Sequence, residues 1–271
     1  MEPADEDLWA IFDRRNLGQD RREQRVNQRI KDMQEHGQQA PRRVRSLSRD
    51  EIVKAAIKVA DAEGSQAISM RRIARELNAG AMSLYWHVSS KDELLDLMLD
   101  AVEGERQFPT VTGEWRTDLT AMARDQRAAL HRHEWLMDFI GGRPPLGPNT
   151  MRNLERSLAV IDTLGLDTVT ALNVLATMAT YVMGAVLREL REMGVERRDA
   201  EGMSNLTDDE LREIFVGHVQ KIRDTGRFPH FVRMYEEGID PDSADTRDER
   251  FEFGLQCVLD GIAARLPGEP G

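Results

Sequence analysis

Tyr85, Trp86 and His87 follow one another in the run from Ser83 to Val88, and each side chain combines a large apolar surface with a hydrogen-bonding group. Three adjacent residues of a helix point in different directions, so they cannot all pack into one core. The alternative is an ordinary bundle in which the aromatic side chains lie inside, and their adjacency disfavours it. The run therefore predicts a helix that contacts a partner.

A second group with possible chemistry is His131, His133 and Glu134. Histidines at positions i and i+2 lie on different sides of a helix and cannot share one metal ion. The sequence also contains no glycine-rich phosphate loop, nucleophile elbow or HExxH motif. We therefore expect neither an enzyme nor a bound cofactor or metal.

Capping signals predict the helices that position the aromatic run. Ser48 to Glu51 has the spacing of a capping box, and Gly64 is the residue type that tolerates a helix end, so a first helix is expected to end near Glu63. Ser69 can cap a second helix over 70–77, which the run 78–80, Asn-Ala-Gly, interrupts.

A third helix of about two turns is predicted from Ala81 to His87. Ser90 to Glu93 repeats the capping-box spacing and opens a fourth helix. Two short helices separated by a tight turn form a helix-turn-helix, whose second helix enters the major groove of DNA. Only Leu84 of the third helix is expected in the core.

The segment 47–99 resembles the DNA-binding domain of the tetracycline-repressor (TetR) family. The runs Leu84-Tyr85-Trp86-His87-Val88 and Leu94-Leu95-Asp96 resemble the tetracycline repressors themselves, and weaker likeness continues through Gly141-Gly142-Arg143-Pro144 and Gly184-Ala185-Val186-Leu187. Residues 1–45 lie outside the resemblance.

The resemblance implies DNA contacts from the start of the second helix, from most of the third, and from a phosphate-binding residue that opens the fourth. Arg71 can pair with guanine through two hydrogen bonds, whereas Ala81 and Met82 can meet only a thymine methyl group. Because these two replace polar and proline residues of the tetracycline repressors, we expect a different operator sequence. The residues implied are Met70, Arg71, Ala81, Met82, Ser83, Tyr85, Trp86, His87 and Lys91.

The charge is unevenly distributed. The net charge is −11, yet residues 14–91 hold 17 Lys or Arg against 9 Asp or Glu, while residues 1–13 carry −5 and residues 92–271 carry −14. A basic region beside an acidic body is the pattern expected of a protein that meets phosphates with one end, and it predicts salt-sensitive binding.

The first 45 residues allow two interpretations. Helical periodicity between about residues 20 and 35 and the arginines at 42, 43 and 45 are compatible with a basic arm on DNA, but the composition equally suits a solvated, disordered tail. For Arg42, Arg43 and Arg45, which directly precede the first helix, we favour contact with phosphates or the minor groove.

The remaining chain predicts an all-α fold, with a three-helix helix-turn-helix domain joined to a larger helical ligand-binding and dimerisation domain. Helices are expected over 115–132, 151–164, 168–192, 207–223 and 247–265, and the domains over 1–45 (extension), 46–92 (DNA-binding), 93–110 (connecting helix) and 111–271 (body). The apolar stripes of 168–192 and 247–265 suit a four-helix dimer interface.

No membrane-length uninterrupted apolar run and no signal peptide are recognised, so a cytoplasmic protein without a membrane partner is expected. The one cysteine, Cys257, stands in an apolar helical stretch and is expected to be a buried small hydrophobic residue.

A ligand pocket is implied by the resemblance alone. Phe139 stands where the tetracycline repressors have a metal-binding histidine, and Met122, Gln126 and Gln107 where they have Asn, Phe and His to hold the drug. We therefore expect a different, more apolar and aromatic effector. The residues assigned to this pocket are Gln107, Met122, Gln126, Phe139, Arg143, Met151 and Met178.

These observations predict a homodimeric, ligand-responsive regulator that binds a palindromic operator in double-stranded DNA and is most simply a repressor. The alternative is a helical adaptor that binds proteins and not DNA.

Overall fold

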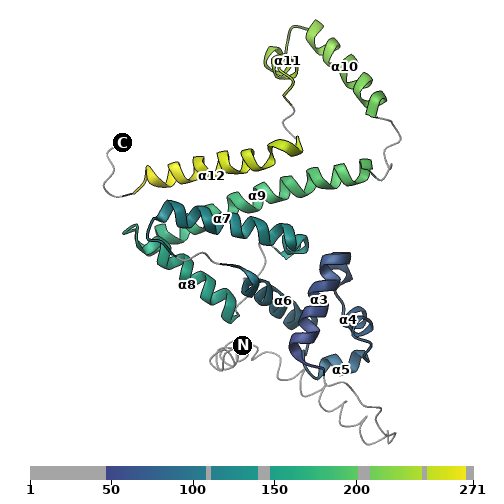
Figure 1. Cartoon of the computed structure of the whole chain (residues 1–271), viewed down its shortest axis with the longest axis vertical. Helices are drawn as coiled ribbons and strands as arrows, with labels where there is room; N and C mark the ends of the chain where they lie inside the picture. The colour runs from purple at the N-terminus through teal and green to yellow at the C-terminus, as the bar shows by residue number, and fades with distance from the viewer. Residues whose placement is uncertain (1–46, 108–110, 140–146, 201–207, 240–242, 267–271) are drawn as a thin grey trace, which may run out of the picture. The chain divides into compact units, whose positions relative to one another are not determined.

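The structure is a computed structural model, and it describes residues 47–107, 111–139, 147–200, 208–239 and 243–266. Within these ranges every regular element is helical, which confirms the all-α prediction, and the chain divides into two compact units, Met1–Leu175 and Ala176–Gly271. The α-helices (Figure 1) are α3 (Arg49–Glu63), α4 (Met70–Glu76), α5 (Ala81–Tyr85), α6 (Lys91–Glu105), α7 (Trp115–Arg132), α8 (Pro148–Asp162), α9 (Thr168–Ala200), α10 (Asp208–Asp224), α11 (Pro229–Glu236) and α12 (Arg247–Ala263). Short 3₁₀ segments are η2 (Ser65–Ala67), η3 (Glu134–Phe139) and η4 (Ala244–Thr246).

The first predicted capping box is present. The Ser48 hydroxyl accepts a hydrogen bond from the Glu51 amide at 3.2 Å, and the Glu51 carboxylate accepts one from the Ser48 amide at 3.1 Å. These reciprocal bonds satisfy backbone donors that have no partner inside α3. At the other end Gly64 has a φ of 80°, so the predicted glycine stop is also confirmed.

The turn between α4 and α5 also follows the prediction. Asn78 has a φ of 50°, and the Ala79 amide donates to the Ala74 carbonyl at 2.9 Å, which closes the end of α4. Both helices are shorter than expected, since α4 ends at Glu76 and α5 at Tyr85.

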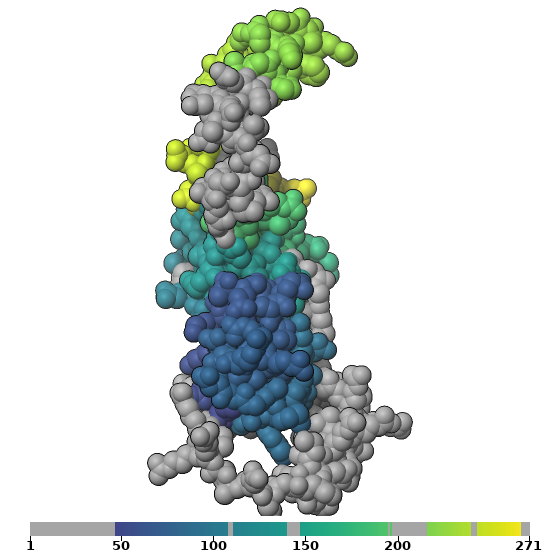
Figure 2. Space-filling view, turned by 90° about the vertical axis from the view of Figure 1, so that its right-hand side faces the viewer, coloured from purple at the N-terminus to yellow at the C-terminus, as the bar shows by residue number. Residues whose placement is uncertain are grey.

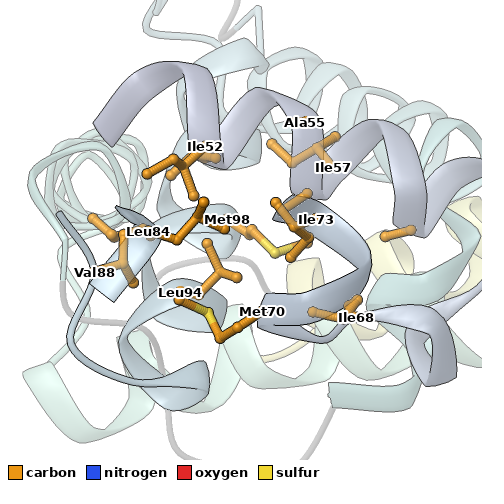
Figure 3. Close-up of a cluster of buried hydrophobic side chains, with 14 of the residues drawn as sticks. Ile52, Ala55, Ile57, Ile68, Met70, Ile73, Leu84, Val88, Leu94 and Met98 are labelled. Atoms are coloured by element: carbon orange, nitrogen blue, oxygen red, sulfur yellow. The ribbon is translucent and has the colours of Figure 1, made fainter. Parts of the chain in front are cut away.

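The N-terminal helical domain, residues 47–105, is called the head below, and its core is built from α3, α4, α5 and α6. Ile52, Ile73, Leu84 and Leu94 are fully buried and converge between these helices (Figure 3). Trp135 of η3 is buried in the same cluster, although the sequence placed it in the body. The head core therefore includes a segment that is about forty residues beyond the helix-turn-helix.

Helix α6 is buried on a second side by α8. The Asp100 carboxylate, buried on α6, accepts hydrogen bonds from the Thr150 amide at 2.9 Å and from its hydroxyl at 3.0 Å. It also accepts one from Asn149 Nδ2 at 3.0 Å. The N-cap of α8 is Gly147, which has no side chain, so Asp100 caps α8 from a different helix.

The fit around this carboxylate is close. A Cβ on Gly147 would lie 2.1 Å from Asp100 Cγ, so only glycine fits there. Burial raises the pKa of Asp100, while the hydrogen bonds from Thr150 and Asn149 act in the opposite direction. One turn along each helix, Asn153 Nδ2 donates to the Glu103 carbonyl and carboxylate, both at 2.8 Å. Polar contacts therefore set the register of α6 on α8.

In the second unit, α9 and α12 are joined around Glu192. Its carboxylate accepts hydrogen bonds from Arg188 at 2.8 Å, Arg247 at 3.1 Å and Arg250 at 2.6 Å. Burial acts to raise the pKa of Glu192, but these hydrogen bonds outweigh it and leave the pKa lowered. The ionised carboxylate is thus the form that holds the two helices together.

Several boundaries and one helix differ from the prediction. The structure has α8 at Pro148–Asp162 and α10 at Asp208–Asp224, extends α9 to Ala200 and ends α12 at Ala263. It also contains α11, a helix that the sequence analysis did not predict. Proline supplies the start of both α8 and α11.

One expectation about the second half of the chain is wrong. Cys257 is exposed on α12, because the buried stripe of that helix is Phe251, Leu255, Leu259 and Ile262. The segment Thr168–Gly194 of α9 is long and apolar enough to cross a membrane by length and composition, with a mean hydropathy of 1.6 in an 18-residue window that is 22% buried. Thr and Asn residues interrupt this segment, so the expectation that no uninterrupted apolar run reaches membrane length still holds.

We expect Asp100→Ala to lower the free energy of unfolding by about 1–3 kcal/mol, because the partly buried donors of Thr150 and Asn149 lose their acceptor. Asp100→Asn should cost less, since one oxygen still accepts. Urea unfolding of the full-length protein at fixed concentration measures both. The control is Glu155→Ala, an exposed acidic residue of α8 that should change stability by less than about 0.5 kcal/mol. Equal effects of the two alanine variants would contradict the capping role.

Candidate DNA-binding surface

Helix α5 presents one apolar and aromatic face to solvent. Met82, Tyr85 and Trp86 are 48%, 38% and 59% exposed, and their spacing of three and four residues places them on one side of the helix. Leu84, on the opposite side, is fully buried. The prediction that only Leu84 of this helix belongs to the core is therefore confirmed.

The other residues predicted around α5 are less exposed. Ala81, Ser83 and His87 are partly buried, whereas Lys91 is exposed at the first position of α6. All of them belong to the head, whose surface is coloured purple to blue in Figure 2. The head thus combines an aromatic face on α5 with a lysine in the next helix.

Met70 and Arg71, the first two residues of α4, are both predicted to contact DNA, but they differ in exposure. Met70 is 6% exposed and packs in the head core, so its side chain is not available to DNA and its predicted role is wrong. The helical period that makes Met70 an early residue of α4 also turns it inward beside Ile73 and Ala74. Arg71, the next residue, is exposed.

The two adjacent arginines of α4 differ in their surroundings. Arg72 donates to Glu63 Oε1 at 2.5 Å and to Glu76 Oε2 at 3.0 Å. The hydrogen bond to Glu63 raises the pKa of Arg72, and the same bond lowers the pKa of Glu63. Arg72 therefore belongs to an ion-pair network on the head, whereas the side chain of its neighbour Arg71 is exposed, as the predicted DNA contact requires.

Sequence reasoning missed a group of polar contacts at the end of α5. Arg49 Nε donates to the His87 carbonyl at 3.2 Å, and Arg49 Nη2 donates to Glu93 Oε1 at 3.0 Å. The other oxygen of Glu93 accepts hydrogen bonds from the Ser89 amide at 2.6 Å and its hydroxyl at 2.5 Å.

This group corrects the second predicted capping box. Ser90 caps α6 by accepting from the Glu93 amide at 3.0 Å, as expected. The Glu93 carboxylate, however, binds Ser89 and Arg49 and does not return to the amide of Ser90. The local spacing could not show that an arginine 44 residues earlier competes for the carboxylate.

His133 lies where the head meets the segment that follows α7. It is buried, with Nδ1 2.7 Å from Asp61 Oδ1 on α3 and Nε2 3.0 Å from Glu105 Oε2 at the end of α6. Trp135 Nε1 also donates to Asp61 Oδ1 at 2.7 Å. Because the two ring nitrogens face different carboxylates, His133 links helices and does not form a metal site. No cluster of metal-ligating side chains occurs elsewhere in the part of the chain that the structure describes.

The residues predicted to bind a ligand are only partly brought together. The backbone N–H of Gln107 donates to the Asp125 carboxylate on α7 at 3.2 Å, so Gln107 lies beside the helix that carries Met122 and Gln126. Phe139 packs edge-on against Trp135 at the head core. Met151 is exposed on α8, and Met178 is buried in the second unit. Arg143, like Arg42, Arg43 and Arg45, lies outside the described residues.

In the head, α4 and α5 form a helix-turn-helix whose second helix, α5, is exposed. Such a head followed by a helical body is the architecture of a helix-turn-helix DNA-binding protein. Two family matches specify the class. Residues 52–98 match "Bacterial regulatory proteins, tetR family", and residues 109–266 match "Tetracyclin repressor-like, C-terminal domain". Because these matches cover most of the chain, the protein belongs to the TetR family of transcription regulators.

Individual relatives of the chain are also transcription regulators of this family. The chain is 39% identical over 219 residues to the HTH-type transcriptional repressor DrrR1 of Streptomyces coeruleorubidus, covering 80% of this chain and 77% of that protein. It is 29% identical over 223 residues to the tetracycline repressor protein class E of Escherichia coli, covering 81% and 92%. The crystal structure of ActR from Streptomyces coelicolor in complex with actinorhodin has a TM-score of 0.63 and 30% identity, covering 83% and 99%. These relatives are regulators and not enzymes.

We expect Arg71→Ala to weaken binding to the protein's own operator by about 1–3 kcal/mol, since one bidentate base contact is lost. Titrations with a selected operator duplex and with an unrelated duplex measure the effect on specific and non-specific binding.

The matched control is Arg72→Ala, the neighbouring arginine on the same helix. Because Arg72 is held by Glu63 and Glu76, its removal should alter the melting temperature more than the preference for operator over unrelated DNA. If Arg71→Ala left that preference unchanged, Arg71 would not read the operator.

Proposed function

We propose that this protein is a cytoplasmic, homodimeric repressor that binds a palindromic operator and is released by a small, largely apolar effector. The observation that carries the proposal is the face of α5, where Met82, Tyr85 and Trp86 are exposed while Leu84 anchors the helix in the head. The basic excess of residues 14–91 supports it, because phosphate contacts supply most non-specific affinity for DNA.

The body supports a two-fold dimer through α9 and α12. Each of these helices keeps large apolar side chains in solvent, Leu172 and Leu187 on α9 and Phe253 on α12. Exposed apolar side chains on long helices are typical of protein interfaces. A palindromic operator needs two copies of α5 about 34 Å apart, and a two-fold dimer is the symmetry that supplies two equivalent copies.

The proposed effector differs from a magnesium–tetracycline complex. ActR is similar to this chain and has a crystal structure in complex with actinorhodin, which supports an organic molecule as the effector. In this chain Phe139, at the position that the resemblance gives to a metal-binding histidine, packs on the head, and Gln107 offers an amide where the tetracycline repressors have a histidine. By linkage, an effector that weakens operator binding is itself bound less tightly when operator is present.

Selection of bound duplexes from a random DNA pool tests the proposal directly. We expect an enriched palindrome, and footprinting at moderate salt should then show protection of both half-sites by the full-length protein. Scrambling one half-site should weaken binding, because the dimer then contacts a single specific half-site. A protein that enriches no sequence and protects no site would support the adaptor alternative.

A thermal-shift measurement tests the effector assignment. A ligand at about a hundred times its Kd stabilises a protein by about 2.7 kcal/mol. We expect magnesium with tetracycline to leave the melting temperature of this protein unchanged, while the same mixture stabilises the Escherichia coli class E repressor, the positive control. Strong stabilisation of this protein would show that the apolar effector is the wrong class.

A further inference from the structure

The recognition helix α5 is too short to be stable by itself. It contains five residues, whereas isolated helices need about 12–15 residues to form in water. Its N-cap, Gly80, provides no side-chain hydrogen bond, and one side chain, Leu84, is buried. The direction of the exposed face therefore depends on contacts made at the ends of the helix.

At the C-terminal end Val88 is buried in the head core, and the polar contacts converge on one carboxylate. Arg49 donates at the same time to the His87 carbonyl and to Glu93, and Glu93 holds both the amide and the hydroxyl of Ser89. We call Arg49, Glu93 and Ser89 the polar clamp. The clamp joins the first turn of α3, the residues just after α5 and the first turn of α6.

The clamp lies beside the predicted DNA contacts. His87, whose carbonyl it holds, directly follows Trp86, and Glu93 lies two residues after Lys91. The Glu93 side chain is 19% exposed and that of Arg49 is 44% exposed, so the carboxylate is the better shielded partner. Hydrogen bonds to a charged group are stronger than neutral ones, and Glu93 accepts three of them at 2.5–3.0 Å from two other segments of the head.

We propose that Glu93, acting through Arg49 and Ser89, is a positioning residue for operator recognition. It sets the position of Trp86 and His87 and does not touch DNA itself. The inference rests on the proposed function, since it concerns how the same surface recognises its operator.

The proposal predicts that removing Glu93 changes the affinity for the operator in the opposite direction to the change expected from its charge alone. A carboxylate near a DNA-binding surface repels phosphates, so its removal should strengthen binding if charge were its only effect. Loss of the clamp should instead weaken operator binding, because α5 loses the contacts that direct its exposed face. The sign of the change therefore separates positioning from electrostatics.

The first test compares Glu93→Ala with Asp92→Ala in the full-length protein. Asp92 is the exposed acidic neighbour in the same first turn of α6, so both variants remove one negative charge from the same place. We expect Glu93→Ala to bind the selected operator roughly tenfold more weakly, the scale of one lost hydrogen bond to a charged group. Asp92→Ala should bind equally or more tightly.

Salt dependence and non-specific binding provide the readout that general destabilisation would not give. Since Glu93 contacts no phosphate, Glu93→Ala should keep the slope of log affinity against log salt and its affinity for an unrelated duplex. Circular dichroism and melting confirm that the head is folded. If Glu93→Ala does not fold, Glu93→Gln keeps the shape of the side chain and is tested in the same way.

A second test uses the arginine. Arg49→Lys keeps the positive charge but lacks the planar group that binds the His87 carbonyl and Glu93 together. It should weaken operator binding as Glu93→Ala does, and the double variant should be no weaker than either single one, because both remove the same clamp.

Three results would overturn the inference: tighter or unchanged operator binding by folded Glu93→Ala or Glu93→Gln, full activity of Arg49→Lys, or additive losses in the double variant. If the unaltered protein selects no operator, the proposed function fails before the clamp is tested, so the two failures are distinguishable.

Discussion

The fold of the first unit depends on α6 being buried on two sides at once. One side places Leu94, Met98 and Val102 in the head core, and the other presents Asp100 to the first turn of α8. A helix held in this way cannot rotate without exposing apolar side chains or leaving a buried carboxylate without donors, and both changes cost free energy. The position of the head relative to α8 is therefore a property of α6.

Local signals made the head predictable. The capping box at Ser48, the positive φ of Asn78 and the isolated buried Leu84 each depend on residues within a few positions of one another, and all three are confirmed. The errors arose where a distant residue competes. Met70 turned inward because its helix packs on α3, and the second capping box lost its carboxylate to Arg49.

The candidate ligand residues were less predictable for the same reason. Phe139 and Trp135 belong to a short 3₁₀ segment whose apolar side chains pack on the head, and no periodic pattern of six residues can indicate a partner so far away in the sequence. Cys257 was misplaced because α12 carries apolar residues on more than one face. A single sequence shows that a helix is apolar, but contacts decide which face is buried.

The same polar contacts bear on how an effector signal would reach DNA. Apolar surfaces can slide by small steps, whereas the bonds of Asp100 to Thr150 and of Asn153 to Glu103 are satisfied in one register only. His133 adds a second link, since it contacts Asp61 in the head and Glu105 at the end of α6. If an effector acts by displacing α6, that helix must change between discrete arrangements. The effector can shift the equilibrium between two arrangements only by the difference in its affinity for them. Because both links hold the head to α6, we expect the two to move as one body, so that a small tilt of α6 would change the angle of α5 while the fold of the head stays intact.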